Sequence, residues 1–147
     1  MYVFSGGIDL SRKDAHLFLG RFEGSRAYRA PEKLIGSIKG SCHRLAALIQ
    51  FESGARVSEV NHLGERDLKG VLKDAVTGKD VGCLRIEKGK GGKSREVYVR
   101  PDTYRMVEKE IRKGNGRFEF DKDRYRLGLK EAAEKSGQTY NGSHGLR

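Results

Sequence analysis

The 147-residue sequence has no tryptophan, two prolines, two cysteines and no long hydrophobic run. Because Cys42 and Cys83 lie far apart and form no Cys-x-x-Cys pair, the sequence suggests neither a disulfide framework nor a zinc ribbon, and we expect two reduced packing residues. No apolar stretch approaches the roughly 20 residues of a membrane span, and residues 1–10 lack the features of a secretory signal. These absences predict a cytoplasmic protein without a membrane partner, associated with the nucleoid if its source is prokaryotic.

Positive charge is abundant. The chain carries 30 Lys and Arg against 20 Asp and Glu, a net charge of +10, while 36% of its residues are hydrophobic, enough to build the core of one folded domain. Such an excess favours a polyanionic partner, because Lys and Arg release the counterions condensed on phosphates. Nucleic acid is therefore the leading partner, and an incidentally basic, solvated surface is the alternative.

Hydrophobic periodicity indicates helices in the first part of the chain. Residues 1–30 form a segment of uncertain structure, in which Asp9 or Ser11 could cap a short helix that ends at Phe22. From Pro31 to about Ser53, apolar residues recur at steps of three and four. This spacing predicts one continuous, largely buried helix.

Beyond Gly54, strand and helix patterns alternate. Two-residue alternation and turn residues predict a small antiparallel sheet with strands at residues 68–72, 81–87 and 95–99. Helical spacing predicts helices at residues 56–63, from Asp102 or Thr103 to about Gly114, and from the N-cap Asp121 through Ala133, with Gly137 after its end. The predicted fold class is α+β, mainly helical, with a small antiparallel sheet that carries a lysine-bearing β-hairpin.

The hairpin loop, residues 88–94, is rich in glycine and lysine. Gly92-Lys93-Ser94 matches the end of a phosphate-binding Walker A loop, but Glu87 stands where that motif requires its first glycine. The loop also lies between two strands rather than before a helix, so a nucleotide site is not supported. Taken alone, the loop is best interpreted as a flexible turn with solvated lysines.

Histidine spacing gives no support for a metal site. His16, His43, His62 and His144 form neither a His-Glu-x-x-His pattern nor a Cys/His ligand set, so we predict no metal and no cofactor. His144 and Arg147 stand three residues apart, which would place an imidazole beside a guanidinium on one helix face. By itself this pair could be a coincidence.

Four segments in order carry a resemblance to a known family. They are Gly54-Ala55-Arg56-Val57-Ser58-Glu59-Val60, then Leu63 and Asp67, then Gly89-Lys90-Gly91-Gly92-Lys93-Ser94-Arg95, and finally His144-Gly145-Leu146-Arg147. Each segment alone is weak, but the four together closely resemble the catalytic domain of the tyrosine recombinases (phage integrases). The resemblance covers residues 31–147 and implies a tyrosine-recombinase-like catalytic core.

The resemblance implies site-specific DNA recombination or integration. In this family a tyrosine attacks a DNA phosphodiester, forms a 3′-phosphotyrosyl bond and frees a 5′-hydroxyl, and reversal onto another strand rejoins the DNA without ATP or another cofactor. Arg56 and Arg147 match the arginines that hold the non-bridging phosphate oxygens. A planar guanidinium suits this role because it is always charged and binds two oxygens at once.

The remaining site residues follow from the same family pattern. Lys90 matches the general acid that protonates the departing 5′-oxygen, with Lys93 and Lys88 as the alternatives. His144 would hydrogen-bond the phosphate and assist proton transfer. Glu59 would support the site without reacting, and if buried it would need a His or Arg partner. The alternative without a functional role is that Glu59 is an exposed carboxylate paired with the Arg56 side chain.

The implied partners are double-stranded DNA and further recombinase protomers, which assemble in this family as a tetrameric synapse. Lys88, Lys93 and Arg95 of the hairpin are the expected DNA contacts. The alternative function is a non-catalytic DNA-binding remnant or regulator derived from a recombinase. An RNA-binding domain is less well supported, because no aromatic-rich sheet motif is present.

The sequence departs from the family pattern at both ends. All six tyrosines precede His144, so none occupies the position of the nucleophile. Residues 1–30 are also too few for the family's separate DNA-clamping domain. We therefore expect a partial catalytic domain, residues 31–147, that lacks the nucleophile region and is inactive by itself. Because a helix beginning near His144 is too short to form alone, we also expect a frayed end with His144 and Arg147 misplaced.

Overall fold

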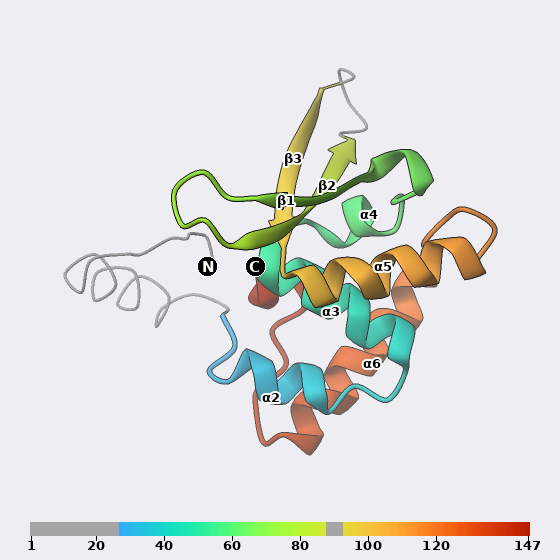
Figure 1. Cartoon of the computed structure of the whole chain (residues 1–147). Helices are drawn as coiled ribbons and strands as arrows, with labels where there is room; N and C mark the ends of the chain where they lie inside the picture. The colour runs from blue at the N-terminus through green and yellow to red at the C-terminus, as the bar shows by residue number, and fades with distance from the viewer. Residues whose placement is uncertain (1–26, 88–92) are drawn as a thin grey trace.

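The computed structural model describes residues 27–87 and 93–147, in which a three-stranded sheet lies over a group of helices (Figure 1). The elements follow in the order α2 (Pro31–Gly36), α3 (Ser41–Ser53), α4 (Val57–Val60), the 3-10 helix η1 (Glu65–Asp67), β1 (Leu68–Lys73), β2 (Asp80–Glu87), β3 (Ser94–Val99), α5 (Pro101–Lys113), α6 (Lys122–Lys135) and the 3-10 helix η2 (Ser143–Leu146). Helices combined with a small antiparallel sheet agree with the predicted α+β class. The helix predicted to end at Phe22 lies outside the described residues.

The sheet is an antiparallel meander in the order β1-β2-β3. Leu84 on the central strand pairs with Leu68 on β1 and with Val97 on β3. Its side chain is fully buried, as is that of Ile86, because this face of the sheet packs on the helices. The three predicted strands are thus confirmed, with small differences at their ends.

The helix predicted to run without interruption from Pro31 to Ser53 is instead two helices. Ser37 ends α2, and its hydroxyl donates to the Lys33 carbonyl at 2.9 Å. Gly40 then takes an extended conformation as the N-cap of α3. Glycine and serine favour such breaks because glycine loses most backbone entropy in a helix and serine competes for backbone hydrogen bonds.

The start of α5 depends on a residue far away in the sequence. We predicted Asp102 or Thr103 as the N-cap, whereas the N-cap is Arg100, followed by Pro101 in the first helical position. The carboxylate of Glu52, near the end of α3, accepts hydrogen bonds from the Arg100 amide at 2.8 Å and from the Thr103 hydroxyl at 2.9 Å. Glu52 therefore does for α5 what a local cap would do.

Helix α6 begins where the sequence predicted. The Asp121 carboxylate accepts from the amides of Asp123 and Arg124 at 2.8 and 3.2 Å, which confirms it as the N-cap. On the buried face of α6, the Tyr125 hydroxyl donates to Gln50 Oε1 at 2.6 Å. This fully buried hydrogen bond ties α6 to α3 through the centre of the molecule.

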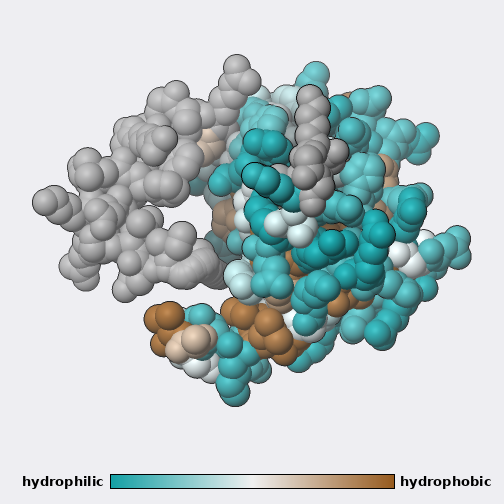
Figure 2. All heavy atoms as spheres, turned by 90° about the horizontal axis from the view of Figure 1, so that it is seen from above, coloured by the Kyte–Doolittle hydropathy of each residue, from teal (hydrophilic) through white to brown (hydrophobic). Residues whose placement is uncertain are grey.

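One continuous core connects the sheet to the helices. Its buried members outside the residues already named are Tyr28, Leu34, Ile35, Ile38, Leu45, Ala46, Ala47, Ile49, Ala55, Val57, Val60, Leu63, Val99, Tyr104, Val107, Ile111, Phe118, Leu129, Ala132, Ala133 and Leu146. Polar side chains cover most of the described surface seen from above (Figure 2). In the described parts of the chain, no helix is long and apolar enough to cross a membrane.

Both cysteines are free, as expected. Cys83 is buried in the central strand, and Cys42 is partly buried against the core. Burial and, to a smaller extent, the nearby Glu96 carboxylate raise the pKa of the Cys83 thiol to about 11. The thiol therefore stays protonated at neutral pH and packs as a small apolar group.

The contact between β2 and α5 gives the first testable prediction. A Cβ atom at Gly82 would overlap the Cβ atom and ring of Tyr104, so Gly82→Ala should destabilise the fold by about 1–3 kcal/mol. Gly36→Ala is the control, because its new methyl group meets nothing within 4 Å and alanine favours the helix. Urea unfolding measures both variants. Equal stability of Gly82→Ala and the unaltered protein would contradict this packing.

Candidate functional site

The candidate site is built around the turn between α3 and α4. Gly54 ends α3, and Arg56 is the N-cap of α4 with an extended backbone. The side-chain amide of Gln50 donates to the Ala55 carbonyl at 3.1 Å, while Gln50 itself is held by Tyr125. The turn that carries Arg56 is thus fixed from the core side by buried hydrogen bonds.

Glu59 lies beneath this turn with only 9% of its surface exposed. Its carboxylate accepts from the Arg56 amide at 2.8 Å and from the two terminal nitrogens of Arg95 at 2.8 and 3.1 Å. The expectation that a buried Glu59 needs an arginine partner is met by Arg95 on β3. The alternative, an exposed pair with the Arg56 side chain, is wrong, because the contact is to the Arg56 backbone.

The pKa of Glu59 depends on the balance between burial, which raises it, and the hydrogen bonds and positive charges around the carboxylate, which lower it. Burial raises it, but the hydrogen bonds from Arg95 and the Arg56 amide, with the positive charges of both residues, outweigh burial and hold the pKa below its ordinary value of 4.5. Glu59 is therefore a carboxylate at neutral pH. Together with Arg95 it forms a bidentate ion pair that joins α4 to β3.

Arg147 reaches the same turn from the C-terminal end of the chain. Its Nε donates to the Gly54 carbonyl at 2.8 Å. Burial lowers the pKa of Arg147, the neighbouring positive charge of Arg56 lowers it further, and Glu59 partly opposes this. The guanidinium groups of Arg56 and Arg147, far apart in sequence, are therefore electrostatic neighbours. Arg95, which is paired with Glu59, is a further positive neighbour of Arg147, so three guanidinium groups and one carboxylate give this region a net positive charge that suits an anion.

His144 lies next to Arg147. Its Nδ1 is 3.4 Å from Arg147 Nη1, at the long end of the hydrogen-bond range. For Nδ1 to accept from the arginine, the neutral ring must carry its proton on Nε2. The exposed imidazole would then have Nε2–H available as a donor to a ligand.

The expectation of a frayed end is wrong in this structure. Ser143–Leu146 form the 3-10 helix η2, whose Leu146 side chain is buried in the core. Figure 1 shows this segment beside the end of α3. The argument from helix nucleation considered an isolated segment, whereas here tertiary contacts hold residues that a lone helical turn could not order.

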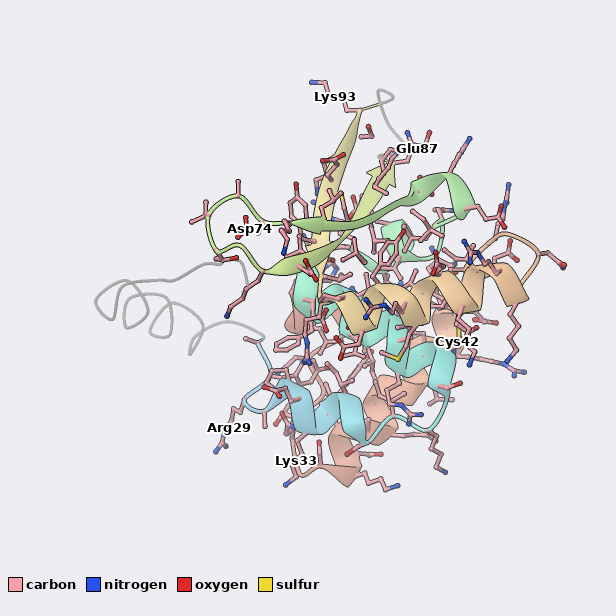
Figure 3. All side chains as sticks on the ribbon, viewed as in Figure 1. Arg29, Lys33, Cys42, Asp74, Glu87 and Lys93 are labelled. Carbon is pink, nitrogen blue, oxygen red and sulfur yellow. The ribbon has the colours of Figure 1, made fainter. Side chains whose placement is uncertain are left out.

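The lysine hairpin is described only in part. Lys88 and Lys90 lie outside the described residues. Lys93 is exposed just before β3, and Figure 3 shows it at the outer end of the sheet, pointing away from the helices. Arg95, the third predicted DNA contact, points to Glu59 and keeps 35% of its side chain exposed.

A second buried ion pair holds the neighbouring strand. Asp67 accepts from the Gly64 amide at 2.9 Å and from Arg85 Nε at 3.1 Å. In the sequence, Asp67 was singled out only as part of the family resemblance, and nothing there indicated Arg85 on β2 as its partner. Similarly, no signal indicated that Arg95 would neutralise Glu59, since both pairings cross between distant elements.

Among the described residues, no group of three or more His, Cys, Asp or Glu could hold a metal ion.

Comparison with solved structures shows that the fold is similar to that of a recombinase. The crystal structure of XerA recombinase superposes with a TM-score of 0.56 at 18% sequence identity. The matched region covers 79% of this chain and 44% of the recombinase chain, so this chain spans less than half of that protein's length. No protein-family model matches the sequence, and no curated protein matches it. The likeness therefore concerns the fold.

The Glu59–Arg95 pair predicts a pH-dependent stability. Because the folded pKa of Glu59 lies below its ordinary value of 4.5, its stabilising effect is present above that pH and is lost as pH falls through the folded pKa. Glu59→Gln should cost about 1–3 kcal/mol of unfolding free energy at pH 7. This difference should shrink below pH 4.5, where the unaltered protein loses the same interaction.

Urea unfolding between pH 7 and pH 3 measures this dependence. Glu131→Gln, which alters an exposed carboxylate on α6, is the control and should leave the pH profile nearly unchanged. A constant difference between Glu59→Gln and the unaltered protein across this range would show that the charge of Glu59 does not contribute.

Proposed function

We propose that this chain is part of the catalytic domain of a tyrosine recombinase, an enzyme that breaks and rejoins DNA strands. The observation that carries the proposal is the meeting of Arg147 with the Gly54–Arg56 turn, which unites two motif segments 93 residues apart. The recombinase-like fold and the net charge of +10 support the same conclusion. The proposed reaction is site-specific recombination or integration through a 3′-phosphotyrosyl intermediate.

The charge balance of the site explains why it would select a phosphodiester. Burial lowers the pKa of Arg147, and the positive charge of Arg56 lowers it further, because the two guanidinium groups repel each other. A phosphate placed between them would remove this repulsion and gain charge-assisted hydrogen bonds. The trigonal-bipyramidal transition state of phosphoryl transfer carries more negative charge on its non-bridging oxygens than the ground-state phosphodiester does. Guanidinium donors aimed at these oxygens therefore lower the barrier.

The other residues have proposed roles that complete this chemistry. His144 would donate from Nε2 to a phosphate oxygen, because its Nδ1 faces Arg147. Lys90 is proposed as the general acid for the 5′-oxygen, with Lys93 or Lys88 as substitutes. Glu59 would act indirectly by fixing the Arg56 backbone and Arg95. The proposed partners are double-stranded DNA and other recombinase protomers, and no step requires a cofactor.

The first test is the salt dependence of DNA binding. Binding of a 30-base-pair duplex should weaken linearly on a log–log plot against salt concentration, and Arg56→Ala should reduce the magnitude of the slope by about 0.9, the amount expected for one lost phosphate contact. Arg126→Ala is the matched control, because Arg126 is an exposed arginine paired with Asp123 on α6. Fluorescence anisotropy provides both slopes.

Identical slopes for Arg56→Ala and the unaltered protein would contradict a phosphate contact at Arg56. Loss of binding in Arg126→Ala alone would move the DNA-binding surface to α6. A higher affinity for RNA than for the same sequence of DNA would favour an RNA-binding protein instead.

A second test concerns the nucleophile. The hydroxyls of Tyr28, Tyr104 and Tyr125 are engaged in hydrogen bonds to the backbone or to Gln50. We expect this chain by itself to form no covalent adduct with a nicked suicide DNA substrate, because all six of its tyrosines precede His144, whereas the family's nucleophile comes after the motif that His144 begins. Denaturing gel electrophoresis with end-labelled DNA detects such an adduct. A labelled protein band would refute this expectation and identify a tyrosine within the chain as the nucleophile.

A further inference from the structure

Tyr28 connects the first described residues to the segment that carries His144 and Arg147. Its hydroxyl donates to the Gly142 carbonyl at 2.8 Å and accepts from the Asn141 amide at 3.0 Å. Its own backbone amide donates to the Gly145 carbonyl at 3.3 Å. These three bonds lie on both sides of His144, and Tyr28 is only 6% exposed.

The turn that Tyr28 holds has an unusual backbone. Gly142 has φ 73° and ψ −178°, a region that essentially only glycine occupies without strain. Such a turn needs partners for its exposed amide and carbonyl groups, and the Tyr28 hydroxyl satisfies one of each. Burial raises the pKa of Tyr28 above its ordinary 10.0, so the hydroxyl keeps the proton that it donates.

A second contact, between Gln138 and Ala30, holds the same part of the chain. Gln138 Oε1 accepts from the Ala30 amide, and Gln138 Nε2 donates to the Ala30 carbonyl, both at 3.0 Å. Residues 28–30 thus hold the chain from Gln138 to Gly145, while the Gly54 carbonyl holds Arg147 beyond it. The segment that bears the imidazole and the guanidinium is fixed before and after these groups.

We propose that Tyr28 is a positioning residue for the anion site: by locking the Asn141–Gly142 turn and the Gly145 carbonyl, it sets where His144 and Arg147 meet the Arg56 turn. This inference rests on the proposed function in so far as the anion is a DNA phosphate. The mechanical part, that Tyr28 controls the order of Arg147, stands on the geometry alone. Tyr28 itself touches no reacting group.

The test is Tyr28→Phe, which keeps the ring and removes the hydroxyl. Inorganic phosphate is titrated into the full chain while the Arg147 Nε–H signal is followed by NMR, with assignment from Arg147→Lys. We expect Tyr28→Phe to weaken phosphate binding about fivefold or more, roughly the effect of losing one hydrogen bond. Exchange of the Arg147 Nε–H with water should accelerate by about the same factor.

Tyr104→Phe is the matched control. Tyr104 is 5% exposed, and its hydroxyl accepts from the Gly70 amide at 2.8 Å in the sheet, so the variant loses a comparable buried bond elsewhere. We expect both variants to lower the melting temperature, but Tyr104→Phe to leave phosphate affinity and Arg147 exchange unchanged. Equal effects of the two variants on these readouts would overturn the positioning role and leave only a contribution to stability.

The two proposals fail in distinguishable ways. If phosphate leaves the Arg147 signal of the unaltered protein unmoved, the anion site fails, while the exchange rates still decide the role of Tyr28. If Tyr28→Phe does not fold, native-state exchange of the unaltered protein in low urea decides it. The Asn141 amide and the Arg147 Nε–H should then lose protection together. An Arg147 that stays protected after the Asn141 amide has opened would overturn the proposal.

Discussion

The buried Glu59 carboxylate is the constraint on which the candidate site depends. A carboxylate removed from water is tolerated only where charge and hydrogen bonds compensate it, and here the compensation comes from the Arg56 amide and the fork of Arg95. Because these partners belong to different elements, the same interaction fixes the start of α4 and docks β3 against it. The position of Arg56 and the base of the lysine hairpin are thereby set by one side chain.

This arrangement leaves the site short of negative charge. Glu59 neutralises one guanidinium group, while Arg56, Arg95 and Arg147 contribute three. The folded protein therefore retains repulsion between these guanidinium groups. A cluster of this kind is expected where an anion completes the structure on binding, since the ligand relieves repulsion already present in the free protein.

Local chemistry was enough to predict the elements whose signals lie within a few residues. The Asp121 cap, the three strands and the short helix after Arg56 are of this kind. The break at Ser37 was missed because hydrophobic spacing continues across it, although the glycines on either side favour an interruption. Partners from distant elements could not be predicted: nothing near Arg100 in sequence indicates that Glu52 caps α5. The motifs predicted that Arg147 and Arg56 would share one site, and Arg147 does contact the Gly54 carbonyl of the Arg56 turn, whereas Lys90 lies outside the described residues. They did not predict that Arg95 would neutralise Glu59.

The difference between local interactions and contacts from distant elements also explains the ordered C-terminal segment. Four residues cannot stabilise a helical turn by backbone bonds alone, yet burial of Leu146 and the hydrogen bonds to Tyr28 and Gly54 supply that stability from outside the segment. The bond from Arg147 Nε to Gly54 also orients the planar guanidinium, so that its remaining donors have a defined direction. A lysine, with a single ammonium group, could not be held by the backbone at one nitrogen and present others to a phosphate. The attachment that orders the chain end is therefore also the one that would make Arg147 a directional phosphate ligand.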